Sequence, residues 1–535
     1  MATILHNGKF VTLEQGAIVS ALLIKGSKIA ALGTLEEVAQ HTSPDTPRVD
    51  LAGRTVLPGI VDSHNHVISA GVAMGGVLLF GCNTIAEAVA RISAKAATLP
   101  PGAWLQGAGW IESQFVENRP LSLEELDQAA PDNPLILHRL FGASLANSKA
   151  LQLAGIGKGS GQPPRGEIVR DAAGNPTGYL KNGAQGMVTS IIPQPTSGNP
   201  LEELQAAVIR ATEEYIRYGI TTILEPGVTP RNMKAYQTTR NMGRLPIRLA
   251  MMPAWHGLYA TMDSDLNSLV PTLGVFEGFG DEWLRLAALK MAIDGGVGSK
   301  TALMNEPWKD GSHTNIPLRL DLERLEEYFT LGHSEGWSIG IHCCGDKAQD
   351  IANRTFDKVI NQATRPHRHH IIHGYFATAE SLEIMARQGI GVSVQPGFIY
   401  VEGDIYEEHL PKAKVDTFKP LRTYLQHGIK VFANSDMTSA HYNPFLGIYS
   451  AVTRTTSQGV QLGAAECVTI EEALELFIKN GAWYCGLEDQ VGSLKVGKEA
   501  DLAVIDRDIL TIPSAEIKDV QVLQTYSAGR LIYSV

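Results

Sequence analysis

The sequence contains little cysteine and no excess of basic residues. Its 535 residues include five cysteines, an odd number without C-x-x-C spacing, and a chain this long can bury a core that needs no disulfides. We therefore expect a reducing, cytoplasmic location. The formal net charge of −11 argues against a nucleic-acid partner and against binding to an anionic membrane surface.

Long hydrophobic runs and low-complexity tracts are also missing. No apolar run approaches the ~20 residues of a membrane span, and the first residues alternate like a strand, so no signal peptide is expected. What is present is the composition of a soluble globular protein, with 44% hydrophobic residues, 19% charged residues and 53 glycines. The length suggests one large domain with additions.

The most informative motif is V-L-P-G-I-V-D-S-H-N-H-V at residues 56–67. An apolar run with a Pro-Gly turn leads to Asp62, His64 and His66 at the end of a short predicted strand. Alternate side chains of a strand share a face, so the two histidines can bind one metal ion. An H-x-H pair alone is weak evidence, since another occurs at His367 and His369, but the turn and strand before this pair give it weight.

Strand-like and helical runs alternate from Gly219 onward, which is the pattern of a β/α barrel. With a first strand at Ile60–His66, eight barrel strands are predicted. The other seven are Ile220–Glu225, Arg248–Ala254, Arg285–Ile293, Ser338–His342, His369–His373, Gly391–Gln395 and Val431–Asp436. Barrel enzymes place their chemistry at the carboxyl ends of strands. We therefore expect the metal-binding side chains at these strand ends to meet at one site. They are His64, His66, Lys290, His342, His373 and Asp436.

The sequence thus predicts an α/β protein in which a (β/α)8 TIM-type barrel carries two additions. Both ends are rich in short strands, so residues 1–56 and 490–535 are expected to form one small β-sandwich domain. Residues 57–72 would hold the first barrel strand. The next barrel strand is too distant for an ordinary βα connection, so residues 73–199 are expected to form an inserted α+β domain, and residues 200–489 the metal-binding barrel.

These motifs resemble the amidohydrolase superfamily of metal-dependent hydrolases. G-A-G-W-I-E-S (107–113), L-A-N-S-K-A-L (145–151) and N-P-T-G-Y-L (175–180) are similar to its YtcJ-like branch, which includes N-substituted formamide deformylases. One departure concerns substrate binding. Where that branch usually has Asp-Gly-His, this chain has Phe141-Gly142-Ala143, so a contact made by that histidine would be missing.

The resemblance implies a binuclear metal centre formed by His64, His66, Lys290, His342, His373 and Asp436. Imidazoles and carboxylates together favour a first-row divalent ion, here two Zn²⁺ per chain. Relatives with this pattern carry a lysine carboxylated by CO₂, which bridges the two metals. An ammonium at Lys290 would be costly to bury. The alternative is an unmodified Lys290 paired with Asp294 or Glu225.

The implied reaction is hydrolysis of a C–N amide bond in an N-substituted formamide or N-acyl compound. A metal-activated hydroxide would attack the carbonyl, and Asp436 would shuttle the proton to the departing nitrogen; the simpler interpretation of Asp436 is a helix N-cap. Two alternatives stay open: a mononuclear deaminase of a cyclic amidine, and a non-catalytic regulatory member of the same fold. The expected partner is a small-molecule substrate, and a homodimer is possible for barrels of this type.

Several other residues lie on predicted loops or strand ends. A substrate-binding role is predicted for four of them, and His313 is a weaker candidate of the same kind. Glu225 is expected to form an ion pair at the barrel mouth, Cys344 to be structural, and Asp346 to anchor the loop after the strand of His342. The four predicted substrate contacts are Trp110, Trp308, Gln395 and His441.

Overall fold

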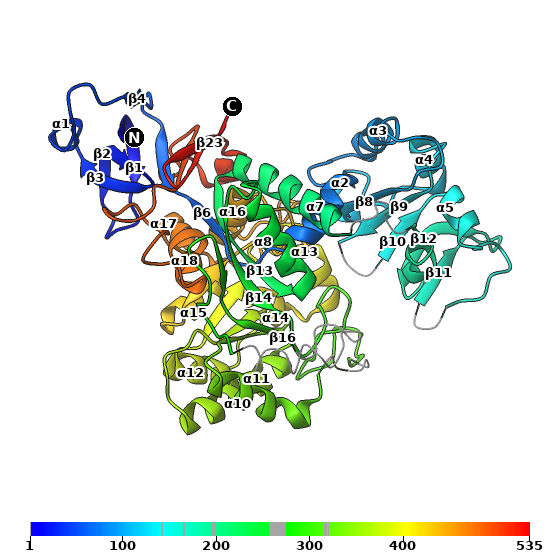
Figure 1. The fold of residues 1–535 in the computed structure, drawn as a ribbon. Helices are drawn as coiled ribbons and strands as arrows, with labels where there is room; N and C mark the ends of the chain where they lie inside the picture. Colours follow the sequence, from blue (N-terminus) through cyan, green and yellow to red (C-terminus); the bar gives the residue numbers. More distant parts are fainter. Residues whose placement is uncertain are drawn as a thin grey trace.

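The computed structural model describes residues 2–140, 143–163, 166–193, 200–255, 274–314, 318 and 320–535. Three parts are visible along the chain (Figure 1). A β-rich part contains both termini, a central α/β part carries most of the helices, and a third part, shown in cyan, projects from the centre. Phe141 and Gly142 lie outside the described residues, whereas Ala143 begins a buried strand.

Both ends of the chain contribute strands to one eight-stranded sheet. Its order is β23-β22-β21-β5-β1-β2-β3, with β4 paired to β1. The junction is antiparallel, with Val56 of β5 opposite Val504 of β21. The sandwich predicted here is not confirmed, because all eight strands belong to one connected sheet. The strands are β1 (Ala2–Val11), β2 (Ile18–Lys25), β3 (Lys28–Gly33), β4 (Arg48–Asp50), β5 (Thr55–Pro58), β21 (Leu502–Ile505), β22 (Val522–Ser527) and β23 (Arg530–Ser534).

The projecting part is built on a six-stranded mixed sheet with its own hydrophobic core. The sheet order is β11-β12-β10-β9-β8-β7, and α3 (Ile85–Ala96) and α4 (Leu123–Ala129) pack against it through buried aliphatic side chains. This part therefore contains both strands and helices. The strands are β7 (Val77–Leu78), β8 (Leu105–Trp110), β9 (Leu135–Arg139), β10 (Ala143–Ala146), β11 (Gly166–Arg170) and β12 (Pro176–Asn182).

The central part contains two parallel sheets, ordered β15-β14-β13-β6 and β16-β17-β18-β19-β20. Their edges meet through backbone contacts: Trp255 N–H donates to the Lys290 carbonyl at 2.8 Å, and Asp436 N–H donates to the His64 carbonyl at 2.9 Å. The strands are β6 (Ile60–Asp62), β13 (Ile220–Val228), β14 (Arg248–Pro253), β15 (Leu284–Leu286), β16 (Leu289–Ala292), β17 (Ile339–Cys343), β18 (His370–His373), β19 (Gly391–Val394) and β20 (Val431–Ala433).

One stretch predicted as a single strand forms two strands in the structure. Arg285–Ile293 is split, because the chain changes its pairing partner at Ala287. The Ala287 N–H still donates to Met251 of β14, whereas Leu289 donates to Ser338, at the start of β17. Lys290 consequently lies inside β16 in register with Gly340, two residues before the level of His342.

Helices cover the outside of the parallel strands (Figure 1). Thr469 and Glu472 form a capping box at the start of α17. No helix in the described ranges is both long and apolar enough to cross a membrane. The helices around the strands include α7 (Pro200–Tyr215), α8 (Pro230–Asn241), α10 (Leu325–Ser334), α11 (Asp346–Gln362), α12 (Ala379–Gln388), α16 (Pro444–Thr453), α17 (Ile470–Leu474) and α18 (Asn480–Tyr484).

A buried ion pair joins the terminal sheet to the central strands. Arg248, fully buried at the start of β14, contacts Asp501 and lies 3.4 Å from Glu499. Asp501 also accepts the Ala528 N–H at 2.7 Å. These contacts give the segment around Asp501 a structural role.

We expect Arg248→Met to lower the free energy of unfolding by about 3–5 kcal/mol, because it leaves the buried Asp501 carboxylate without its cation, whereas Glu499 keeps its ion pair with Lys28. Urea unfolding measures this change. Arg244→Met, which removes an exposed pair with Glu213, should cost less than about 1 kcal/mol. Equal stability of the two variants would contradict the assigned role of Arg248.

Candidate metal centre

Three of the predicted ligands meet just beyond the ends of β6 and β20. The Asp436 Oδ1 lies 3.3 Å from the Nε2 of His66 and 3.6 Å from the Nε2 of His64. The backbone brings them together, since His66 N–H donates to the Met437 carbonyl and Asp436 N–H to the His64 carbonyl, both at 2.9 Å. Burial lowers the pKa of His66, but the hydrogen bond and charge of Asp436 outweigh this effect and raise it above its usual value.

Asp62 holds the loop that carries Asp436. Its two carboxylate oxygens accept the Ser435 N–H at 3.0 Å and the Ser435 hydroxyl at 2.6 Å. Asn65 donates to Asp62 and accepts the Tyr215 hydroxyl. Asp436 has a left-handed φ of 49°, which is unfavourable for a residue with a Cβ and persists only where surrounding contacts impose it. The aspartate of the D-x-H-x-H motif is therefore a positioning residue.

The other two predicted histidines meet at the ends of β17 and β18. The Nε2 of His373 lies 2.9 Å from the Nδ1 of His342, and the ring centroids of His64 and His373 are 6.1 Å apart, so the two groups of ligands adjoin. Cys344 Sγ lies 3.4 Å from the Nε2 of His342. Cys344, His342 and His373 together are close enough to hold a metal ion, so the structural role of this thiol stays a prediction.

Hydrogen bonding at this histidine pair fits a bound cation. The Nε2 of His342 faces the Gly295 carbonyl at 2.9 Å, and the Nδ1 of His373 faces the Oε1 of Gln395 at 2.8 Å, so each carries a proton. Burial, then the charges of His342 and Lys290, hold the pKa of His373 well below its usual value, so its other nitrogen is bare. The remaining ring nitrogens, the Nδ1 of His342 and the Nε2 of His373, lie 2.9 Å apart, close enough for both to bind one metal ion.

The first group of ligands, His64, His66 and Asp436, also includes a ring nitrogen that is not hydrogen-bonded among the described residues. The buried Nδ1 of His64 has no hydrogen-bond partner among the described residues. Burial and the Lys290 charge lower the pKa of His64 well below its usual value, so its imidazole is neutral and can bind a metal.

The charge of Lys290 acts on histidines of both ligand groups. Its side chain is buried, with 3% exposure. Its charge lowers the pKa of His64 and His66 from the first group and of His373 from the second. A cation beside three imidazoles opposes metal binding, whereas an anionic form of the same side chain would favour it.

Gln395 was predicted to contact the substrate, but its side-chain amide forms hydrogen bonds within the protein. Its Oε1 accepts from His373, and its Nε2 donates at 2.9 Å to Asn434, which in turn donates to Ser393. This network fixes the amide orientation and hence the protonated nitrogen of His373. Gln395 thus acts on the metal site through His373.

We expect Gln395→Leu to weaken metal binding by about 10–100-fold, the usual effect of removing a hydrogen bond to a ligating histidine. Chelator competition measures the affinity. Gln426→Leu, at an exposed position ending α15 (Leu421–Gln426), is the matched control and should bind metal normally. Unchanged affinity in Gln395→Leu would show that the network does not tune the site.

The other residues predicted to contact the substrate lie in different parts of the structure. Trp110 is fully buried in the core of the inserted part, and its indole N–H donates to the Leu137 carbonyl; we withdraw it as a substrate contact, because β8 directs it inward. Trp308 packs in an apolar cluster that also contains Cys344. His441 borders a cavity of about 340 Å³ between the inserted part and the loop after β20. His313 is exposed.

Two further predictions concern loop anchors. Asp346 accepts the Asn305 N–H at 2.7 Å and binds the Lys414 ammonium at 2.6 Å, which confirms its anchoring role. Among the described residues Glu225 does not form the expected ion pair; it accepts the Val67 N–H at the start of α2 (Val67–Gly75). Burial raises the pKa of Glu225 to about 7, against the opposing effect of the His66 charge.

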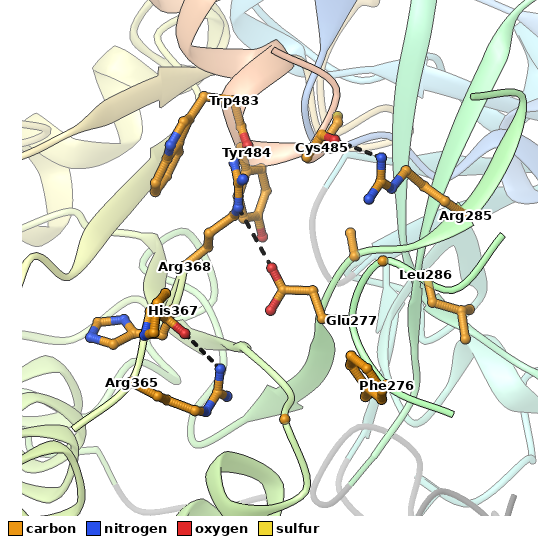
Figure 2. Close-up of a pocket in the computed structure, with 15 residues that line it drawn as sticks. Phe276, Glu277, Arg285, Leu286, Arg365, His367, Arg368, Trp483, Tyr484 and Cys485 are labelled. Carbon is orange, nitrogen blue, oxygen red and sulfur yellow. Dashed lines mark hydrogen bonds and ion pairs between the residues drawn. The ribbon is translucent and has the colours of Figure 1, made fainter. Parts of the chain in front are cut away.

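A separate cavity of about 520 Å³ lies at the opposite, amino ends of β17 and β18. Three arginines border it (Figure 2), but their guanidinium groups already have partners. Arg285 donates to the Gly486 carbonyl, Arg365 to the Trp337 carbonyl, and Arg368 lies between Glu277 and Glu488. The cavity is therefore bordered by structural hydrogen bonds and ion pairs, on the face away from the histidines of the metal centre.

Two residues near the metal ligands were missed by the sequence interpretation. Glu402 lies on α13 (Gly397–His409) in step with Phe398 and Tyr406, so an acidic residue on an apolar helical stripe was the available signal. Lys419 follows α14 (Lys412–Asp416) in a turn without any motif. Both are buried.

Comparisons with known proteins agree with this geometry. Residues 48–533 match the model of the amidohydrolase family. The chain is 28% identical to an N-substituted formamide deformylase of Arthrobacter pascens, covering 97% of this chain and 96% of that one. It is 29% identical to the putative amidohydrolase YtcJ of Bacillus subtilis, over 100% and 99% of the two chains. An uncharacterized metal-dependent hydrolase from Pyrococcus horikoshii has the same fold, with a TM-score of 0.74 and 23% identity over 96% of this chain and 99% of that one.

Proposed function

Because this chain belongs to the amidohydrolase family, we propose that it hydrolyses the C–N bond of a small N-substituted formamide or N-acyl compound. That it is a metal-dependent amidohydrolase follows from the family and from relatives that carry hydrolase names. The substrate class is taken from a deformylase that is 28% identical. The observation that carries the proposal is the convergence of His64, His66 and Asp436 beside the adjoining pair of His342 and His373.

In the proposed centre, His64, His66, His342, His373, Asp436 and a carboxylated Lys290 would hold two Zn²⁺ ions. When bound, such ions polarise the carbonyl and lower the pKa of water to about 7. Support for the lysine modification comes from the burial of Lys290 and its influence on histidines of both groups. Imidazole and carboxylate donors together suit zinc.

Asp436 is the proposed proton shuttle. Its Oδ1 lies within 3.6 Å of two imidazoles, and its side chain is buried, so its proton exchange with bulk water is limited. The carboxylate takes a proton from the attacking water and delivers it to the departing nitrogen, because an amide anion is too basic to leave unprotonated. Asp62 keeps the carboxylate in place through Ser435.

We further propose that the two arcs of parallel strands act as one eight-stranded barrel. The backbone hydrogen bonds at both seams support this, as does the mouth position of the ligands at β6, β17, β18 and β20. The split of β15 and β16 then counts as one barrel position. Residues 73–199 would form the insertion beside the mouth, and the terminal sheet would lie against the central part through Arg248 and Asp501.

Elemental analysis and an activity panel test the proposal together. Protein loaded with zinc should contain two ions per chain, carry the mass of CO₂ on Lys290, and release amine from formamides or N-acyl compounds. One ion, an unmodified Lys290 and ammonia release from cyclic amidines would support the deaminase instead. Metal-loaded protein that turns over neither class would indicate the regulatory alternative.

A further inference from the structure

Two buried ionic side chains near Asp436 have no part in the metal chemistry described above. Lys419 is fully buried and Glu402 is 1% exposed. They come from separate segments, α13 and the turn between α14 and α15. Burying an ion without a close partner is costly, so the presence of both requires a compensating interaction.

Glu402 presents two acceptors without donors. Neither of its carboxylate oxygens has a hydrogen-bond partner among the described residues. Burial raises the pKa of Glu402 well above its usual value; the charges of Lys419 and Arg139 oppose this shift and that of Asp436 adds to it. A buried acceptor of this kind is normally satisfied, and an N–H group of a ligand would satisfy it.

Lys419 presents donors without an anion. In the described part of the chain its ammonium has one hydrogen bond, to the Oε1 of Gln395 at 3.3 Å, out of three that it can donate. It lies 3.8 Å from the ring centroid of Tyr375 and 4.8 Å from that of Phe398. Its backbone is fixed, since Arg454 donates to the Lys419 carbonyl at 3.1 Å.

Both side chains interact with residues of the metal centre but share no hydrogen bond with each other among the described residues. Each interacts electrostatically with Asp436, and Gln395 binds Lys419 and His373 through the same oxygen. Lys419 and Glu402 attract each other, yet no hydrogen bond joins them within the described residues. A ligand with an acceptor at one end and a donor at the other fits this arrangement.

We propose that Lys419 and Glu402 form a substrate subsite in which Lys419 binds a carboxylate and Glu402 accepts the N–H of the scissile amide. This inference rests on the amide hydrolysis proposed above and narrows the substrate to a secondary amide that bears a carboxylate, as in an N-acyl amino acid. A neutral N-alkyl formamide would leave the Lys419 ammonium without an anion. The rings of Tyr375 and Phe398 exclude water and strengthen the charge interaction.

Matched substrates test the subsite in the zinc-loaded protein. An N-acetyl amino acid should exceed its carboxamide in kcat/KM by about 10–100-fold, the range expected for a hydrogen bond between charged groups. Lys419→Met should remove this preference by raising KM for the acid, with unchanged metal content. Glu402→Gln should lower kcat/KM for the N–H substrate but not for its N-methyl analogue. The exposed controls Lys412→Met and Glu408→Gln should behave as wild type.

Equal kcat/KM for acid and carboxamide in the wild type would overturn the inference, as would an equal loss on both in Lys419→Met. Calorimetric titration with the N-acetyl amino acid separates this inference from the proposed reaction. Binding that weakens at least about 10-fold in Lys419→Met, without turnover of any amide, would sustain the subsite and reject the hydrolase. Turnover without discrimination between acid and carboxamide would support the hydrolase and reject the subsite.

Discussion

Replacing Asp436 by Asn should reduce kcat for amide hydrolysis by at least about 10³-fold, within the range that general acid–base groups contribute. Asn tolerates the left-handed backbone that this position requires, with φ of 49°, so the variant removes the charge and keeps the loop. The Ser435 contacts to Asp62 are unaffected. The measurement is kcat of the metal-loaded protein, together with its melting curve.

Asp45→Asn at an exposed loop position is the matched control and should retain full activity. A melting curve close to wild type is expected for both variants. Turnover in Asp436→Asn that equals wild type would overturn the proton-shuttle role, whatever the metal content. A large loss of turnover with metal still bound would locate the defect in proton transfer.

The second large effect is expected at Lys290. Lys290→Met keeps an apolar chain in the buried β16 position but cannot be carboxylated, so binding of two ions should fall to one or none. Losing a bridging ligand should cost more than the ~100-fold that loss of an outer hydrogen bond can cost. Elemental analysis and kcat measure the two effects.

A smaller side chain offers a chemical test of the carboxylate. In Lys290→Ala, millimolar acetate or propionate can occupy the vacated space and restore part of the metal binding and activity. Lys234→Ala, at an exposed position on α8, is the control and should not respond to acetate. Two bound ions and full turnover in Lys290→Met would contradict a bridging role and favour an unmodified lysine.

The ligand types were predictable from local patterns. Period-two alternation places His64 and His66 on one face, and apolar runs that end on His342 and His373 mark the ends of buried strands. The strand-rich character of both ends was predictable for the same reason. Each of these features depends on interactions between residues close in sequence.

Pairing between distant segments could not be predicted in the same way. The hydrogen bond from Asp436 to His64 spans most of the chain, and the change of partner at Ala287 depends on where β14 and β17 lie. Gln395 was predicted to contact the substrate, whereas its hydrogen bond with His373 places it beside a predicted metal ligand. Trp110 was also predicted to contact the substrate, although it faces the inserted core.

The sequence by itself determined the residue types, their order and the strand faces on which they lie, because these follow from backbone periodicity. Only the tertiary structure decided which of them meet: Asp62 with Ser435, Gln395 with His373, and Lys419 near Glu402. Such contacts depend on packing between segments that no local propensity encodes, and the burial that makes an ionic pair informative exists only after folding.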